Sequence, residues 1–307
     1  MNENDTLAES LLRAKHRLYG PLIDEVRNAQ AFEQWSKQLP PRTDKSQFSS
    51  DDSKALLLAK QEGIVTLAAV FSAMASASSL STIGSVLHQG IYPRDLGTLP
   101  FLGLCRASLE GAVRTLWVLT ADNQSERITR SFRLRRIELI EHKRLTERRC
   151  ERIETEGALL ETTIAMFQEI NETIDAIESL GLAKIKSRIQ FRDMISDIDI
   201  WIQSLPEELE LDILKSSFAD RAIEAYSVSS GAIHGLQWIS DLVSTPDDIY
   251  AMSLDIFTIT KLCLELAVSL VEIHSSAPGP VASRNTVPEY LKSFIESLPK
   301  PEVWERN

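Results

Sequence analysis

The helix predicted over residues 101–120 carries a row of three charged side chains that could take part in chemistry. Arg106, Glu110 and Arg114 are four residues apart, so the carboxylate can pair with either guanidinium on one side of the helix. The row falls between two faces suited to packing, where charges are expected to be at least half buried and to need partners. It is therefore either an ion pair that fixes the position of the helix or a cluster that faces a ligand.

The two packing faces of the same helix differ in side-chain size. One is apolar and consists of Leu102, Cys105, Leu109, Ala112, Val113 and Leu116. The other consists of Gly103, Ala107 and Gly111, whose small side chains would let a second helix approach closely. We expect the rest of the chain to be organised around this helix.

A second group of polar residues lies in the stretch YSVSSGAIHGLQW, which begins at Tyr226. Ser230 and His234 share one side of the predicted helix. The histidine can be a general base or a pH-responsive contact, and the alternative is a core histidine held by hydrogen bonds. Because small residues lie beside both Glu110 and His234, we expect these two side chains to converge with Arg106.

The third feature is a concentration of positive charge. Residues 127–152 hold ten basic and four acidic residues in a chain whose formal net charge is −11. Charge gathered on one helix is typical of a phosphate-binding element. The alternative is a solvated helix that pairs with acidic parts of its own chain or of a partner.

Motifs for metals and phosphate loops are missing from the sequence. It contains no HExxH, no glycine-rich P-loop, no CxxC pair and no EF-hand loop, and its five histidines are scattered. A Ser–His–acid hydrolase is not expected either, because no G-x-S-x-G elbow occurs on an α/β pattern. The sequence therefore predicts neither a metal site nor a cofactor.

Three stretches together resemble a group of bacterial helical proteins: CRASLEGAVRTLWVL, ERITRSFRLRRIELIEHKR and YSVSSGAIHG. That group has an R-x-x-x-E helix, then an arginine-rich helix and a late Ser…His-Gly helix. It is distantly similar to HEPN-type domains, which are helical bundles found in toxins, phage-defence ribonucleases and nucleotide-binding proteins. The resemblance covers roughly residues 55–275 and implies a HEPN-like bundle.

Catalytic HEPN ribonucleases use an arginine followed, after four to six residues, by a histidine. The resemblance would make His142 the base that activates a 2′-hydroxyl group and Arg136 the residue that stabilises the phosphate. Arg135 also fits the spacing to His142.

The elements that must position these residues are all helical, since no sustained alternation of period two occurs. We expect an N-terminal helical arm and linker over residues 1–52, a helical core over 53–277, and a linker with a short amphipathic helix over 278–307. Within the core, a long helix should start near Ser53 and be bent or split by the serine-rich run 76–81. Further helices are expected over 126–156, 158–180, 183–204, 207–243 and 247–276.

Composition indicates a globular protein of a reducing compartment. The three cysteines lack CxxC spacing, which favours free thiols, and the acidic N-terminus shows no signal peptide, so we expect a cytoplasmic protein. Residues 64–87 are apolar and uncharged but contain six serines, which favours a tightly packed soluble helix over a membrane span.

These observations predict a HEPN-like protein with a nucleic-acid-linked stress or phage-defence role, binding RNA or a nucleotide through residues 127–152. Two alternatives stay open. One is a non-catalytic interaction module that binds a protein partner or a second copy of itself. The other is a small-ligand pocket built around Arg106, Glu110, Tyr226 and His234.

Overall fold

The computed structural model describes residues 28–40, 43–88, 98–152, 158–182, 185–209, 212–234, 246–277 and 285–299. These parts are helices joined by turns and contain no strand, which confirms the prediction of an all-α chain. The helices are α2 (Phe32–Ser36), α3 (Gln47–Ala59), α4 (Ile64–His88), α6 (Thr98–Leu119), α7 (Gln124–Arg152), α8 (Ala158–Ser179), α9 (Phe191–Ser204), the 3-10 turn η1 (Glu207–Leu209), α10 (Asp212–Ile233), α12 (Pro246–Ser275) and α13 (Glu289–Ser297).

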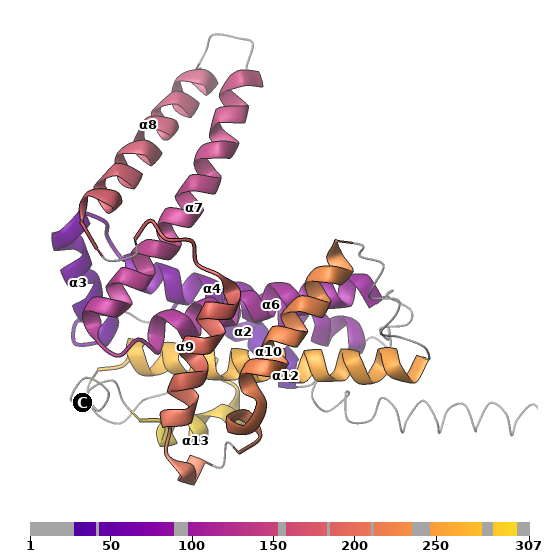
Figure 1. Cartoon of the computed structure of the whole chain (residues 1–307). Coiled ribbons are helices and arrows are strands. Elements are labelled where there is room, and N and C mark those ends of the chain that lie inside the picture. The colour runs from indigo at the N-terminus through magenta and orange to yellow at the C-terminus, as the bar shows by residue number, and fades with distance from the viewer. Residues whose placement is uncertain are drawn as a thin grey trace, which may run out of the picture.

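Helix α6 is at the centre of the molecule. It packs against α4, α12, α10, α9 and α7, and Figure 1 shows α4, α6 and α12 lying along one another as a layer. The whole predicted apolar face of α6, from Leu102 to Leu116, is buried. The expectation that the chain is organised around this helix is therefore confirmed.

The contact between α6 and α4 is unusually close. A Cβ atom on Gly111 would lie 2.5 Å from the carbonyl oxygen of Ser72, so only glycine fits there. Buried hydroxyl groups join the two helices: Ser76 Oγ donates to the Ser108 carbonyl at 2.6 Å, and Thr115 Oγ1 donates to the Ala69 carbonyl at 2.8 Å. The predicted face of small residues, Gly103, Ala107 and Gly111, does not contact α4 along its whole length, however. Ala107 is exposed and Gly103 faces α10.

The break that precedes α4 lies earlier than the sequence predicts. Helix α3 begins at Gln47 rather than near Ser53, and it ends at Ala59 because Lys60 and Gly63 adopt left-handed backbone angles, with φ of 53° and 66°. Helix α4 then runs unbroken through the serine-rich region, so the expected bend or split there is wrong. Its serines are compatible with the helix because their hydroxyl groups donate to carbonyls of α4 itself and of α6.

Helix α4 is also the one described helix that is long and apolar enough, over residues 64–86, to cross a membrane. Half of its most apolar window is buried inside the protein. Its tight packing against α6 accounts for that burial.

Helices α7 and α8 form a hairpin that projects from the body (Figure 1). The first half of α7 packs against α3, α4 and α6, and the outer half has α8 as its neighbour. The helix predicted over 183–204 begins later, as α9 at Phe191. Within the predicted helix over 207–243 the structure has η1 and α10, and residues 210–211 and 235–243 lie outside the described residues.

At the ends of the described chain, α2 packs against α4 and is bonded to α12, and α13 packs on α12. Trp35 of α2 is fully buried and donates from Nε1 to Glu272 Oε1 at 2.9 Å. Leu291 and Ile295 of α13 are buried as well. The predicted boundary at residue 52 falls inside α3, and most of the predicted N-terminal arm, residues 1–27, lies outside the described residues.

Candidate functional site

The charged row of α6 lies at the edge of the helical layer. Glu110 Oε1 pairs with Arg114 Nη2 at 2.7 Å, and Glu110 Oε2 is 4.0 Å from Arg106 Nε. The three side chains retain between 20% and 35% of their accessible surface. They are therefore half-buried, as predicted, and accessible to solvent from one side.

Tyr226 of α10 joins this row. Arg106 Nη2 donates to the Tyr226 hydroxyl at 3.5 Å, and the guanidinium lies 5.1 Å from the centre of the ring. Phe191, the first residue of α9, stacks on the same ring with centroids 3.9 Å apart. Three helices thus meet at Tyr226. Phe191 is not among the predicted site residues, since the helix predicted over 183–204 places it in a helix interior and gives no local signal for this contact.

The predicted convergence of Glu110 with His234 is wrong. His234 is exposed and follows the last residue of α10, while Ser230, one turn earlier, is half-buried. Ile233 lies against Gly103, two turns from Glu110, and Tyr226 lies against Arg106. Because eight residues of helix span about 12 Å, the end of α10 is carried past Arg106 and away from Glu110.

A cavity of about 440 Å³ lies beside Tyr226. It is formed where the segment before α9 passes the middle of α10. Its lining residues are Arg188, Ile189, Gln190, Phe191, Arg192, Ile223, Tyr226 and Ser227. None of these is acidic, although acidic residues outnumber basic ones in the chain by 44 to 33.

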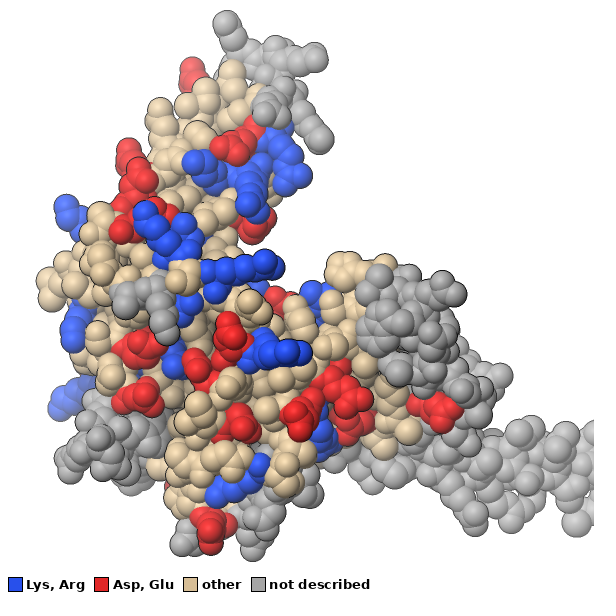
Figure 2. Space-filling model, viewed as in Figure 1, with Lys and Arg blue, Asp and Glu red and all other residues tan. Residues whose placement is uncertain are grey.

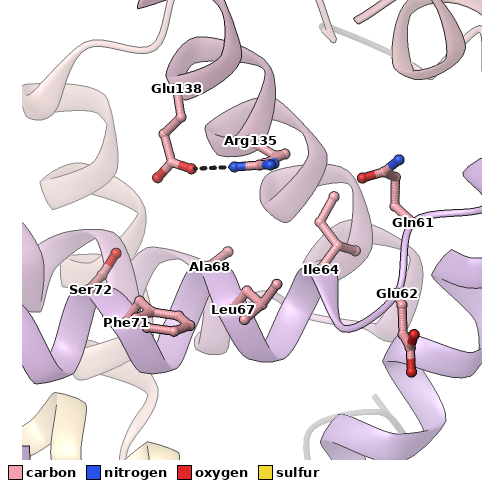
Figure 3. A pocket seen from close by; sticks show the side chains of 9 residues that line it. All are labelled: Gln61, Glu62, Ile64, Leu67, Ala68, Phe71, Ser72, Arg135 and Glu138. Carbon is pink, nitrogen blue, oxygen red and sulfur yellow. Dashed lines mark ion pairs between the residues drawn. The ribbon is translucent and has the colours of Figure 1, made fainter. Parts of the chain in front are cut away.

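A second cavity, of about 270 Å³, lies where α4 meets the base of α7. Figure 3 shows Ile64, Leu67 and Phe71 along its floor and an ion pair on its rim. That pair joins Arg135 and Glu138 at 3.6 Å. Because its arginine is offset by carboxylates, this cavity lacks the positive character of the first.

The first half of the basic helix α7 is neutralised within the protein. Arg127 and Asp51 form a fully buried ion pair, with Nε and Oδ2 2.7 Å apart. Arg130 donates to the Trp117 carbonyl at 2.6 Å and pairs with Asp197 at 3.1 Å. These arginines hold α7 to α3, α6 and α9.

Arg136 and Arg133 also make contacts within the protein. Arg136 pairs with Glu178 of α8 at 2.6 Å, which closes the base of the hairpin. The hydrogen bond from Lys186, followed by the one from Arg136, lowers the pKa of Glu178. Arg133 lies over the Trp117 ring, and burial is the main cause that lowers its pKa.

The outer half of α7 is exposed. Arg144, Arg148 and Arg149 face solvent, and Arg149 makes no side-chain bond within the described part of the chain. Figure 2 shows basic side chains gathered on the outer part of the hairpin, with acidic ones along the α8 edge. Helix α8 contributes the exposed acids Glu161, Glu169, Glu172 and Asp175.

The pair proposed for RNA cleavage is not brought together. Arg136 points to Glu178, and His142 is exposed farther out on the hairpin. Six residues turn a helix by about 240° net, so the two side chains leave α7 in different directions. Arg135, seven residues before His142, shares its face but pairs with Glu138.

The described residues contain no group of three side chains suited to hold a metal ion. Cys105 and Cys263 are fully buried free thiols, and burial raises the pKa of Cys263 to about 12 and that of Cys105 further still. Neither thiol is therefore poised for reaction.

Comparison of the chain with protein-family models, with curated proteins and with solved structures finds no match.

Proposed function

We propose that the protein binds RNA through the outer half of α7, in a HEPN-like stress or phage-defence role in a bacterial cytoplasm. The observation that carries this proposal is the division of the basic helix. Its first half is occupied by intramolecular ion pairs, whereas its outer half carries exposed arginines on a projecting hairpin.

Charge supports the proposal locally. Residues 143–150 contain four basic residues and one acid, in a chain of net charge −11. Arg148 and Arg149 are exposed and make no ion pair within the described residues. A guanidinium in water that has no carboxylate partner is available to a phosphate group, and such contacts dominate affinity for nucleic acids.

The proposal stops at binding. Arg136 is held by Glu178 and does not face His142, so cleavage by that pair has no support from the geometry of one chain. The second alternative, a small-ligand pocket, is favoured by the separate cavity beside Tyr226.

The test is RNA binding by fluorescence anisotropy over a range of salt concentrations. Arg148→Glu/Arg149→Glu is compared with Lys45→Glu/Lys60→Glu, which makes the same charge change on the exposed turns around α3. The first variant should bind at least about tenfold more weakly, and its plot of log affinity against log salt should flatten by about one unit per lost phosphate contact. Equal weakening of both variants, or no binding by the wild type, would overturn the proposal.

A further inference from the structure

The cavity beside Tyr226 has the chemistry of an anion site. It is lined by two arginines, Arg188 and Arg192, and by no acidic residue. On the body of the protein, Arg127, Arg130 and Arg221 each pair with an aspartate. Within the described residues, neither lining arginine makes an ion pair or a side-chain hydrogen bond.

Other lining groups add one donor and one acceptor. The Tyr226 hydroxyl accepts from Arg106 and donates to no described residue, so its proton is available to a ligand. Ser227 Oγ donates to the Ile223 carbonyl at 2.7 Å, which leaves its lone pairs to accept a hydrogen bond. The site therefore offers donors to an anion and an acceptor to a hydroxyl or amino group.

The cavity is also rigidly framed. The ring of Phe191 stacks on the ring of Tyr226, and the guanidinium of Arg106 lies over the same Tyr226 ring. Helix α9 begins here with Gln190 as its N-cap, whose side chain makes no capping hydrogen bond. The N–H groups of Asp193 and Met194 donate to the Gln190 carbonyl, and the carboxylate of Asp193 lies in the first turn, so the arginines and not the helix start supply most of the attraction for an anion.

We propose that this cavity binds the phosphate group of a small molecule, with Arg188 and Arg192 holding the phosphate oxygens and Tyr226 donating a further hydrogen bond. A guanidinium fork suits the tetrahedral oxygens of phosphate. The volume of about 440 Å³ leaves room beyond the phosphate group, since small-molecule sites span about 300–1,000 Å³. Ser227 then accepts from a hydroxyl group of the attached molecule.

The ligand is either free phosphate or a phosphate monoester such as a nucleotide, and calorimetric titration of the full chain separates the two. Inorganic phosphate and AMP serve as probes. AMP binding tighter than phosphate indicates an organic phosphate as the ligand, and equal affinities indicate free phosphate; both results support the site. We expect Arg188→Ala and Arg192→Ala each to weaken binding at least about tenfold. Lys45→Ala, which removes an exposed positive charge from the turn before α3, should leave it unchanged.

Three results would overturn the proposal: no binding of either probe to the wild type at millimolar concentration, wild-type affinity in both cavity variants, or an equal loss in Lys45→Ala. Both cavity arginines are exposed, so their variants should keep the wild-type melting temperature. The inference does not rest on RNA binding by the hairpin. Loss of RNA binding in the hairpin variants and loss of phosphate binding in the cavity variants are separate outcomes.

Discussion

The two halves of α7 use the same kind of residue in opposite ways. In the first half, Arg127 is fully buried against Asp51, and Arg130 holds a backbone carbonyl of α6. In the outer half, Arg148 and Arg149 face solvent. The sequence of the helix is arginine-rich throughout, so the difference comes from what packs against each half: several helices at the base, α8 alone farther out.

A run of arginines in the sequence is therefore not by itself a binding surface. Three arginines of the first half meet a carboxylate from a distant part of the chain: Arg127 meets Asp51 of α3, Arg130 meets Asp197 of α9 and Arg136 meets Glu178 of α8. The carboxylate offsets the cost of removing a guanidinium from water, which is several kcal/mol in a low-dielectric interior. Only arginines without such a partner are available to an external anion.

The largest expected effect comes from breaking the buried pair. Asp51→Asn leaves the Arg127 charge without its carboxylate, and we expect a loss of about 3–5 kcal/mol in the free energy of unfolding, measured by urea denaturation. Glu141→Gln, which breaks the exposed pair with Arg144 on the outer half, is the control and should cost less than about 1 kcal/mol. Similar losses in the two variants would show that the halves do not differ.

The next effect concerns pH. His274 is buried beside Phe48, and burial, followed by the charge of Arg127, lowers its pKa from 6.5 to about 3, although the bond from Nδ1 to the Leu270 carbonyl opposes this. At a pH between about 3 and 6.5, His274 is protonated in the unfolded chain and neutral in the folded one, so the unfolded chain binds more protons. Stability is therefore full above pH 6.5 and falls as the pH is lowered.

The loss of unfolding free energy that His274 causes between pH 7 and pH 5 should be about 2 kcal/mol, since each pKa unit corresponds to about 1.4 kcal/mol. His274→Gln removes the titrating group, so its unfolding free energy should depend less on pH over that range. Parallel curves for the variant and the wild type would contradict the assignment. The other titratable groups are the same in the variant and the wild type, so their contributions to the pH dependence of stability cancel when the two curves are compared.

The smallest expected effect separates two arginines that are three residues apart. Arg133 Nε is buried without a hydrogen-bond partner among the described residues, and its guanidinium lies over the Trp117 ring, so Arg133→Met should cost no more than about 1 kcal/mol of unfolding free energy. Arg130→Met gives up the Trp117 carbonyl and Asp197, and should cost about 2 kcal/mol. Equal costs by urea denaturation would mean that burial, rather than pairing, decides the role of an arginine.

Much of the fold could be predicted from periodicity and breaker residues. The helical class, the central place of α6 and the burial of its apolar face from Leu102 to Leu116 are all read from side-chain spacing. The break before α4 was missed because Lys60, which takes the left-handed conformation, has no distinctive sequence signal. Serine was interpreted as a helix breaker, whereas in α4 it allows close packing.

The candidate site was only partly predictable. Spacing places Arg106, Glu110 and Arg114 together, and Arg106 does meet Tyr226 as the pocket alternative required. The direction of α10 relative to α6 decides where His234 lies, and no local pattern encodes it. Arg188 and Arg192 become neighbours of Tyr226 only through the path of the segment before α9, which is likewise a tertiary property.

The close approach at Gly111 has a consequence for how this sequence can change over generations. Any other residue would place an atom 2.5 Å from the Ser72 backbone oxygen, and neither backbone can yield without separating α4 from α6. Neighbouring positions can exchange one apolar residue for another of similar volume. Position 111 has no such alternatives. We therefore expect glycine to be retained there while other core positions exchange apolar residues.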